Sequence, residues 1–323
     1  MNDRTVSASH VLDRVLVMEM VRVTEAAAVA ASKLIGRGDE KAADHAAVEA
    51  MRQAFDQLAI DGTVVIGEGE RDEAPMLYIG EKVGQGGAAI DIALDPLEGT
   101  TLTAKALPNA LAVMAMAEPG TLLNAPDTYM DKIAIGGGYP EGTIDLDADP
   151  AENIRSLAKA KGVKPSEITA LILDRPRHSK IIESVRSTGA AVRLITDGDV
   201  AGVIATSDPA TGIDIYIGQG GAPEGVLAAA ALRCVGGQIQ TRLVFKKDDE
   251  RARAAKLGIT DFNRKYSLMD LASGDVVFAA TGVTDGSMLS GVHIDREHVT
   301  TESVVMRSAT GTVRWIKARH SRS

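Results

Sequence analysis

Two carboxylates and a hydroxyl are concentrated in the short segment Asp95-Pro96-Leu97-Glu98-Gly99-Thr100. The apolar run 89–94 precedes it and predicts a strand whose carboxyl end presents these side chains, and binding sites are often built at the exposed ends of strands. Mg²⁺ and Mn²⁺ take oxygen ligands from a few carboxylates, from water and from phosphate. The segment therefore indicates a metal site, although Asp-Pro and Glu-Gly are also typical of plain turns.

Two further acidic side chains are placed where they could join such a site. Glu68 follows a short apolar strand pattern in the turn Glu68-Gly69-Glu70, and Asp44 lies in an alanine-rich helical stretch. Each has a simpler interpretation, because acidic residues in turns and on helices mostly face water. Taken alone, these two positions do not distinguish a metal ligand from a solvated carboxylate.

A glycine-rich segment, Gly218-Gln219-Gly220-Gly221, precedes a helical stretch that carries Pro223 and Glu224 in its first turn. We predict a turn that opens a helix, which binds anions through free backbone N–H groups and the helix dipole. Glu224 would hold a metal beside that anion, or would simply be a carboxylate favoured by the dipole. A dinucleotide-binding motif is excluded because Pro223 stands where its third glycine is needed.

The sequence around these motifs has two different patterns of helices and strands, and the change between them lies near residue 145. The earlier part is typical of α+β, with expected helices at 9–35 and 39–58 and expected strands at 62–67, 88–94, 111–117 and 132–135. The later part alternates in the manner of α/β, with strands at 170–173, 192–195 and 213–217 and a helix at 180–187. We expect an α+β domain over 1–145 and an α/β domain over 146–323, with a boundary placed to within about ten residues.

Composition limits the classes of partner. The net charge of −9 argues against nucleic acid, whose phosphates need a surplus of Lys and Arg. The sequence shows neither a signal pattern nor an apolar run long enough to span a bilayer, and the single cysteine, Cys234, implies no oxidising compartment. We therefore expect a cytoplasmic protein without a membrane or nucleic-acid partner.

Together the motifs resemble the metal-dependent phosphatases of the inositol-monophosphatase and fructose-bisphosphatase superfamily, and more narrowly the class II fructose-1,6-bisphosphatases. The resemblance extends from Val21 to about Arg314. Its most specific strings are Gly36-Arg37-Gly38-Asp39, Val65-Ile66-Gly67-Glu68-Gly69-Glu70, the string from Asp72 to Gly80, Asp95-Pro96-Leu97-Glu98-Gly99-Thr100 and Gly220-Gly221-Ala222-Pro223-Glu224-Gly225. It implies a layered α/β/α/β/α fold with the active site between two lobes.

The resemblance also implies a role for each matching position. The metal ligands would be Asp44, Glu68, Asp95, Glu98 and Glu224, and the catalytic residues would be Thr100, Asp44 and Glu68. The substrate contacts would be Glu98, Gly99, Thr100, Tyr129, Arg175, Pro176, Arg177, Asp197, Gly198, Asp199 and Gly221. Arg175 departs from some relatives, which have Lys there, and Arg can bind a phosphate through two donors. Relatives are usually homo-oligomers, so we expect a dimer or a tetramer.

The reaction so implied is hydrolysis of the 1-phosphate of fructose 1,6-bisphosphate, in gluconeogenesis, by water that Mg²⁺ or Mn²⁺ activates. Arg175 and Arg177 would receive the second phosphate, and they would supply cations to this acidic protein. Three alternatives stay open: a second activity on sedoheptulose 1,7-bisphosphate, a non-catalytic sugar-phosphate sensor, and an aspartyl-phosphate phosphatase that uses Asp197 and Asp199.

Overall fold

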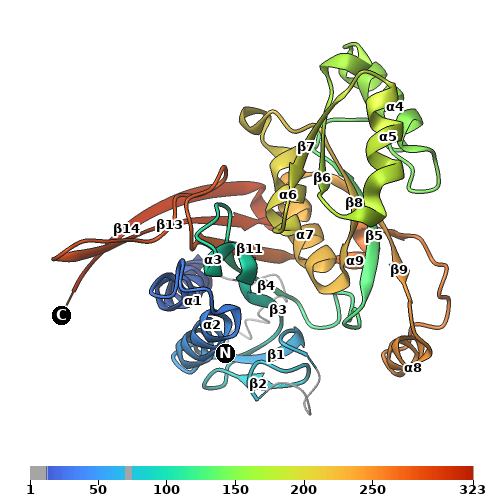
Figure 1. The fold of residues 1–323 in the computed structure, drawn as a ribbon. Coiled ribbons are helices and arrows are strands. Elements are labelled where there is room, and N and C mark those ends of the chain that lie inside the picture. The colour runs from blue at the N-terminus through green and yellow to red at the C-terminus, as the bar shows by residue number, and fades with distance from the viewer. Residues whose placement is uncertain (1–11, 13, 70–74, 323) are drawn as a thin grey trace, which may run out of the picture.

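The computed structural model describes residues 12, 14–69 and 75–322. Helices and sheets alternate in layers (Figure 1). Helices α1 and α2 cover the outer face of one sheet, α6 and α7 lie between the two sheets, and α4 and α5 cover the outer face of the second. The predicted α/β/α/β/α layering is confirmed.

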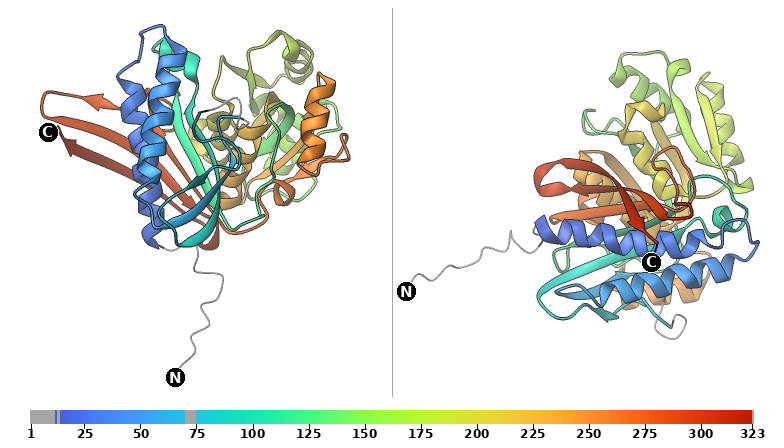
Figure 2. Two further views of the ribbon diagram at one scale, coloured as in Figure 1. Left: turned by 90° about the horizontal axis from the view of Figure 1, so that it is seen from below. Right: turned by 90° about the vertical axis from the view of Figure 1, so that its left-hand side faces the viewer.

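The first sheet has the strand order β12-β13-β11-β4-β3-β1-β2, with β14 paired to β13. Its strands are β1 (Ile60–Ile66), β2 (Lys82–Val83), β3 (Ala88–Glu98), β4 (Leu111–Ala117), β11 (Val276–Gly282), β12 (His293–Ile294), β13 (His298–Arg307) and β14 (Thr312–Ser321). Strands β3, β4 and β11 read as nearly continuous apolar runs because both faces of this part of the sheet are covered. Figure 2 shows the β13–β14 hairpin extending past the helices.

The second sheet has the order β10-β9-β5-β8-β6-β7. Its strands are β5 (Tyr129–Ile135), β6 (Thr169–Leu173), β7 (Ala191–Ile195), β8 (Ile215–Gly221), β9 (Gln238–Val244) and β10 (Tyr266–Ser267). β6, β7 and β8 run parallel, whereas β5 is antiparallel to both of its neighbours. The parallel strands are joined by helices, as the alternating rhythm of this part predicts.

The helices begin and end where sequence signals favour it. Asp39 caps α2 by accepting from the N–H of Ala42, and Asp149 and Gly162 bound α4. The longer helices are α1 (Arg14–Ser32), α2 (Glu40–Phe55), α4 (Pro150–Lys161), α5 (Ser179–Ser187), α7 (Ala222–Val235) and α8 (Asp248–Lys256), and the shorter ones are α3 (Thr100–Ala104), α6 (Asp199–Ile204) and α9 (Leu268–Leu271). The predicted start of the first helix at Ser9 and the acidic residue Glu70 lie outside the described residues.

Two local predictions were wrong in the same way. The acidic segment is not a loop after the strand, because β3 continues through Glu98 and only Gly99 precedes α3. The glycine-rich segment is not a turn, because β8 continues through Gly221 and pairs with β5 along that length. In both places tertiary pairing satisfies backbone groups that local propensity assigns to a turn.

The sheets do not divide the chain at residue 145. β5 precedes that point and belongs to the second sheet, while β11 to β14 follow it and return to the first. Two antiparallel strands can pair although they are distant in sequence. The change in the pattern of helices and strands near residue 145 therefore does not show which sheet a strand joins. Within the described residues, no helix combines the length and apolarity that crossing a bilayer requires.

Candidate active site

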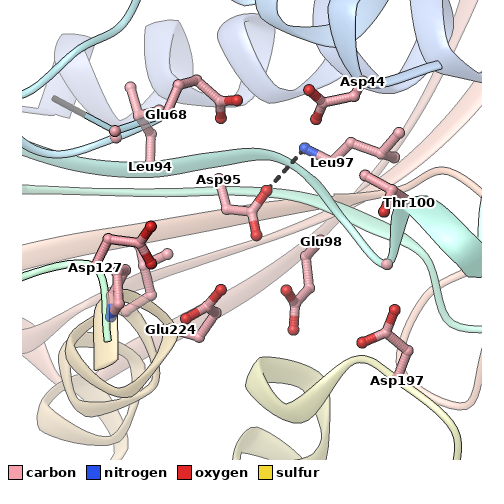
Figure 3. A pocket seen from close by; sticks show the side chains of 15 residues that line it. Asp44, Glu68, Leu94, Asp95, Leu97, Glu98, Thr100, Asp127, Asp197 and Glu224 are labelled. Carbon is pink, nitrogen blue, oxygen red and sulfur yellow. Dashed lines mark hydrogen bonds between the residues drawn. The ribbon is translucent and has the colours of Figure 1, made fainter. Parts of the chain in front are cut away.

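Three carboxylates converge beside the first turn of α7, the helix that lies between the two sheets. Asp95, Glu98 and Glu224 each offer an oxygen, and these oxygens lie within 4.8 Å of one another. A register shift between Asp95 and Glu98 in the pairing of β3 with β4 turns both side chains toward α7, where Glu224 stands in the first turn. Figure 3 shows these side chains facing one another. Glu224 is at least 126 positions from the other two residues, so the fold brings together two motifs that were predicted separately.

The remaining predicted metal and catalytic residues line the same cavity, whose volume is about 300 Å³. Asp44 enters from α2, Glu68 from the end of β1, and Thr100 from the first residue of α3. In Figure 3 the carboxylates of Asp44 and Glu68 lie on the opposite side of Asp95 from Glu224. Gly99 has a φ of 91°, which glycine adopts without strain, so the chain can turn directly from β3 into the helix that carries Thr100.

Burial and mutual repulsion disfavour the charged form of these acids. Burial, and then the charges of Asp95 and Asp44, raise the pKa of Glu68 to about 9. Burial raises the pKa of Glu224 to about 7, with a further increase from Asp199, and raises that of Asp95 to about 6. Burial and then Asp95 raise the pKa of Glu98 well above its usual value. A cluster of this kind is stabilised by a cation placed among its oxygens.

The donor set fits a hard divalent cation. Glu98 uses Oε1 to accept from the N–H of Val200 at 3.1 Å, and Asp95 uses Oδ1 to accept from the N–H of Leu97 at 3.0 Å. Glu224 Oε2 is buried and has no hydrogen-bond partner among the described residues. Its position requires glycine at 221, because a Cβ there would stand 1.8 Å from that oxygen. A buried, unpaired carboxylate oxygen is costly unless a ligand satisfies it.

The raised pKa values predict how the metal-free protein responds to pH. The folded state holds protons on Glu68, Glu224 and Asp95 that the unfolded chain releases near pH 4 to 4.5. Between those values and the folded pKa values the folded state binds more protons, so its stability falls as pH rises from about 5 to about 9. Thermal unfolding in chelator should show this fall, and Mg²⁺ or Mn²⁺ should stabilise the protein most at the higher pH. A midpoint that rises over this range in chelator would contradict it.

A second cavity of about 460 Å³ adjoins the first, and the two share Glu98, Asp127, Asp197 and Glu224 in their walls. Its far side is lined by Tyr129, Arg175, Arg177 and Arg253. The Tyr129 ring lies 3.6 Å from Lys246 Nζ and 5.1 Å from the Arg177 guanidinium carbon, measured to the ring centroid. Arginines therefore line the second cavity but not the first, and the two cavities share a wall of carboxylates.

A buried histidine that sequence reasoning missed fixes the Arg175-Pro176-Arg177 segment. This segment begins a 3₁₀ turn (Pro176–His178), with Pro176 at its first position. His178 Nδ1 lies 2.7 Å from the carbonyl of Leu173, and Nε2 accepts from the N–H of Gln219 at 2.9 Å. Because Nε2 accepts, Nδ1 carries the proton, and the neutral ring ties the turn to β6 and β8.

A buried ion pair lies at the wall of the second cavity, which Asp199 lines. Asp199 Oδ2 accepts from Lys132 Nζ at 2.6 Å, with 1% of the lysine side chain and 7% of the aspartate side chain exposed. A Cβ at Gly220 would stand 1.9 Å from that oxygen. Asp199 is thus already paired, which argues against it as the free acid of an aspartyl-phosphate phosphatase, whereas Asp197 is half-buried and lines both cavities. Gly198, with a φ of 85°, lies between Asp197 and Asp199 in the chain.

Asp127, Lys132, His178 and Arg253 are among the site residues that sequence reasoning missed. Lys132 lies in a predicted strand within an apolar run, and the signal that could have found it is that a lysine buried in such a run needs a partner. Nothing in the sequence near Asp127 or Arg253 indicates which side of its element faces a cavity.

Comparison with known proteins agrees with this arrangement. The model of the family "Bacterial fructose-1,6-bisphosphatase, glpX-encoded" matches residues 14–320. The chain belongs to this family. It is 47% identical over 322 residues to "Fructose-1,6-bisphosphatase 1 class 2" of Escherichia coli strain K12, covering 95% of each chain, and equally similar to class 2 enzymes of E. coli O6:H1 and Shigella flexneri.

A solved structure of an inositol monophosphatase from Anabaena (Nostoc) sp. PCC 7120 has a TM-score of 0.32 and 15% identity, covering 60% of this chain and 72% of that chain. A similarity this low adds nothing to the family assignment. As a member of the glpX-encoded fructose-1,6-bisphosphatase family, the chain is a phosphatase with an acidic cluster suited to a divalent metal.

Proposed function

We propose that the chain hydrolyses the 1-phosphate of fructose 1,6-bisphosphate to give fructose 6-phosphate and phosphate, as a step of gluconeogenesis. The observation that carries this proposal is the pair of adjoining cavities, the first lined by carboxylates without arginine and the second lined by three arginines. A phosphate that is to be hydrolysed can be neutralised by metal among the carboxylates, and a second phosphate can pair with guanidinium groups. A monophosphate would leave one of these two cavities without a partner.

Asp44, Glu68, Asp95, Glu98 and Glu224 are the residues that we assign to Mg²⁺ or Mn²⁺. A divalent cation bound there would neutralise charge on the reacting phosphate and make water a better nucleophile at neutral pH. The unpaired Oε2 of Glu224 and the mutual repulsion of the cluster support this assignment. The oxygen-only donor set matches the ligands that both ions prefer.

The protein's own part in the reaction begins with the attacking water. Thr100 holds that water through its hydroxyl and passes a proton toward Asp44, which lines the same cavity. Attack at phosphorus forms a bond to the water oxygen and breaks the bond to the sugar oxygen, which leaves on fructose 6-phosphate and takes up a proton from water. Arg175 and Arg177 hold the phosphate that is kept. Tyr129, Asp197 and Asp199, with the backbone of Gly99 and Gly221, border the sugar, whereas the predicted contact Gly198 lines neither cavity.

A substrate panel tests the proposal. With Mg²⁺ or Mn²⁺ present, phosphate release should be rapid from fructose 1,6-bisphosphate, and the product should keep its 6-phosphate by phosphorus NMR. Inositol 1-phosphate should be at least about 100-fold poorer in kcat/KM, because the arginine end would be unfilled. Sedoheptulose 1,7-bisphosphate belongs in the same panel as the extended bisphosphate. Equal turnover of inositol 1-phosphate and fructose 1,6-bisphosphate would contradict the role given to the arginines.

We further propose that the protein acts in the cytoplasm as a homo-oligomer, a dimer or tetramer, which light scattering of the purified chain can check. The single buried cysteine, Cys234, supports a compartment without disulfides. The long hairpin of β13 and β14, with Trp315 60% exposed, is a surface that supports self-association.

A further inference from the structure

A third arginine, Arg253 of α8, reaches the cavity that contains Arg175 and Arg177. Helix α8 follows β9, and Glu250 fixes its first turn by accepting from the N–H of Lys246 at 2.5 Å and of Lys247 at 3.2 Å. The same carboxylate lies 3.4 Å from the hydroxyl of Thr128, beside the substrate-facing Tyr129. Arg253 is one helical turn after Glu250, so its side chain extends along the same cavity wall.

The guanidinium of Arg253 is anchored but not neutralised. Its Nη2 donates to the carbonyl of Asp127 at 3.2 Å, and its Nε is buried without a hydrogen-bond partner among the described residues. Across the part of the chain that the structure describes, no carboxylate lies within ion-pair distance of it. A buried guanidinium N–H without an acceptor is costly, so this side chain lacks a partner that an anion would supply.

Arg175 and Arg177 are held in the same manner. Arg175 Nη1 donates to the carbonyl of Asp174 at 3.2 Å, and Arg177 Nη2 donates to the carbonyl of Gln219 at 2.7 Å. Like Arg253, neither forms an ion pair with another described residue. Each of the three therefore donates from one nitrogen to a backbone carbonyl, and its positive charge is not neutralised by a carboxylate. A phosphate dianion, with three acceptor oxygens, matches this set.

We propose that Arg253 is a specificity-determining residue that binds the phosphate which is not hydrolysed, and that it favours sugar bisphosphates over monophosphates. This inference rests on the proposed function, since it concerns the arginine end of that site. The contact is made to a group that does not react, so it contributes equally to substrate and transition state and acts on KM more than on kcat.

Arg251 on the same helix gives a matched control. It pairs with Asp248 at 3.1 Å and lies against the Phe245 ring, and it does not line either cavity. Arg253→Gln should lower kcat/KM for fructose 1,6-bisphosphate by about 10- to 100-fold, mostly through KM, whereas Arg251→Gln should leave it unchanged. Arg253→Lys keeps the charge and should recover part of the loss.

Two ligands separate phosphate recognition from a structural role. Fructose 6-phosphate carries only the retained phosphate, so its inhibition constant should rise in Arg253→Gln by about the same factor as KM. Fructose 1-phosphate lacks that phosphate, so its turnover should be unchanged by the substitution. Equal losses on both substrates, or an unchanged KM and inhibition constant, would overturn the inference. Failure of the wild-type chain to hydrolyse fructose 1,6-bisphosphate with metal would instead overturn the proposed function.

Discussion

Asp95→Asn should lower kcat for fructose 1,6-bisphosphate by about 10³-fold, equivalent to about 4 kcal/mol of transition-state stabilisation, yet leave the metal-free protein at least as stable as the wild type. Asp95 is one of the three converging carboxylates, and burial raises its pKa to about 6. Asn keeps the oxygen that accepts from the N–H of Leu97 but removes the charge that the site needs. The opposite signs on activity and stability are characteristic of a functional cluster. Steady-state kinetics and urea unfolding in chelator measure the two effects.

Asp91 is the matched control for this substitution. It lies on the same strand, β3, outside both cavities, and its Oδ2 accepts from the N–H of Gly120 at 2.7 Å. Asp91→Asn can retain that bond and should change kcat by less than about threefold. If Asp95→Asn lost stability in chelator as well as activity, the residue would be a structural partner and not a ligand held at a cost.

Thr100→Ala should lower kcat by about 100-fold or more while KM changes little. Thr100 is the first residue of α3 and lines the carboxylate cavity with Asp44, where we place the attacking water. The hydroxyl acts on the water and not on the sugar. Its removal should therefore slow the chemical step and leave substrate binding largely unchanged. Single-turnover measurements separate this step from product release.

Two neighbouring substitutions sharpen the test of Thr100. Thr100→Ser keeps the hydroxyl and should recover most of kcat, whereas Thr101→Ala, at the next position of α3, should behave as the wild type. An undiminished kcat in Thr100→Ala would show that another group orients the water. A rise in KM with unchanged kcat would move Thr100 from catalysis to substrate binding.

Much of the carboxylate site could be predicted because its acidic residues come from short motifs with strong local signals. The apolar run before Asp95 predicted a strand, and Pro223 with Glu224 predicted the start of a helix. These local signals could not predict the register shift between Asp95 and Glu98. They also could not predict that β8 extends through Gly221. Both depend on pairing with β4 and β5, which local sequence does not encode.

The parts that could not be predicted are those made by distant segments. Strands β11, β13 and β14 complete the first sheet from the C-terminal part of the chain, so the two sheets take strands from both sides of residue 145. Lys132 and Asp199 are 67 positions apart, and only the closed fold shows that they pair. Arg253 has an exposed neighbour, Arg251, with the same chemistry, so sequence offers no reason to choose between them.

Phosphate release from fructose 1,6-bisphosphate, measured on protein stripped of metal and then reconstituted, tests whether the carboxylate cluster acts through a bound cation. We propose that the cluster of Asp95, Glu98 and Glu224, with its unpaired oxygen, acts through a bound cation. Release should be absent in chelator and should return in proportion to added Mg²⁺ or Mn²⁺. Release that continues in chelator, with no metal found by elemental analysis, would show that the carboxylate cluster does not act through a metal ion.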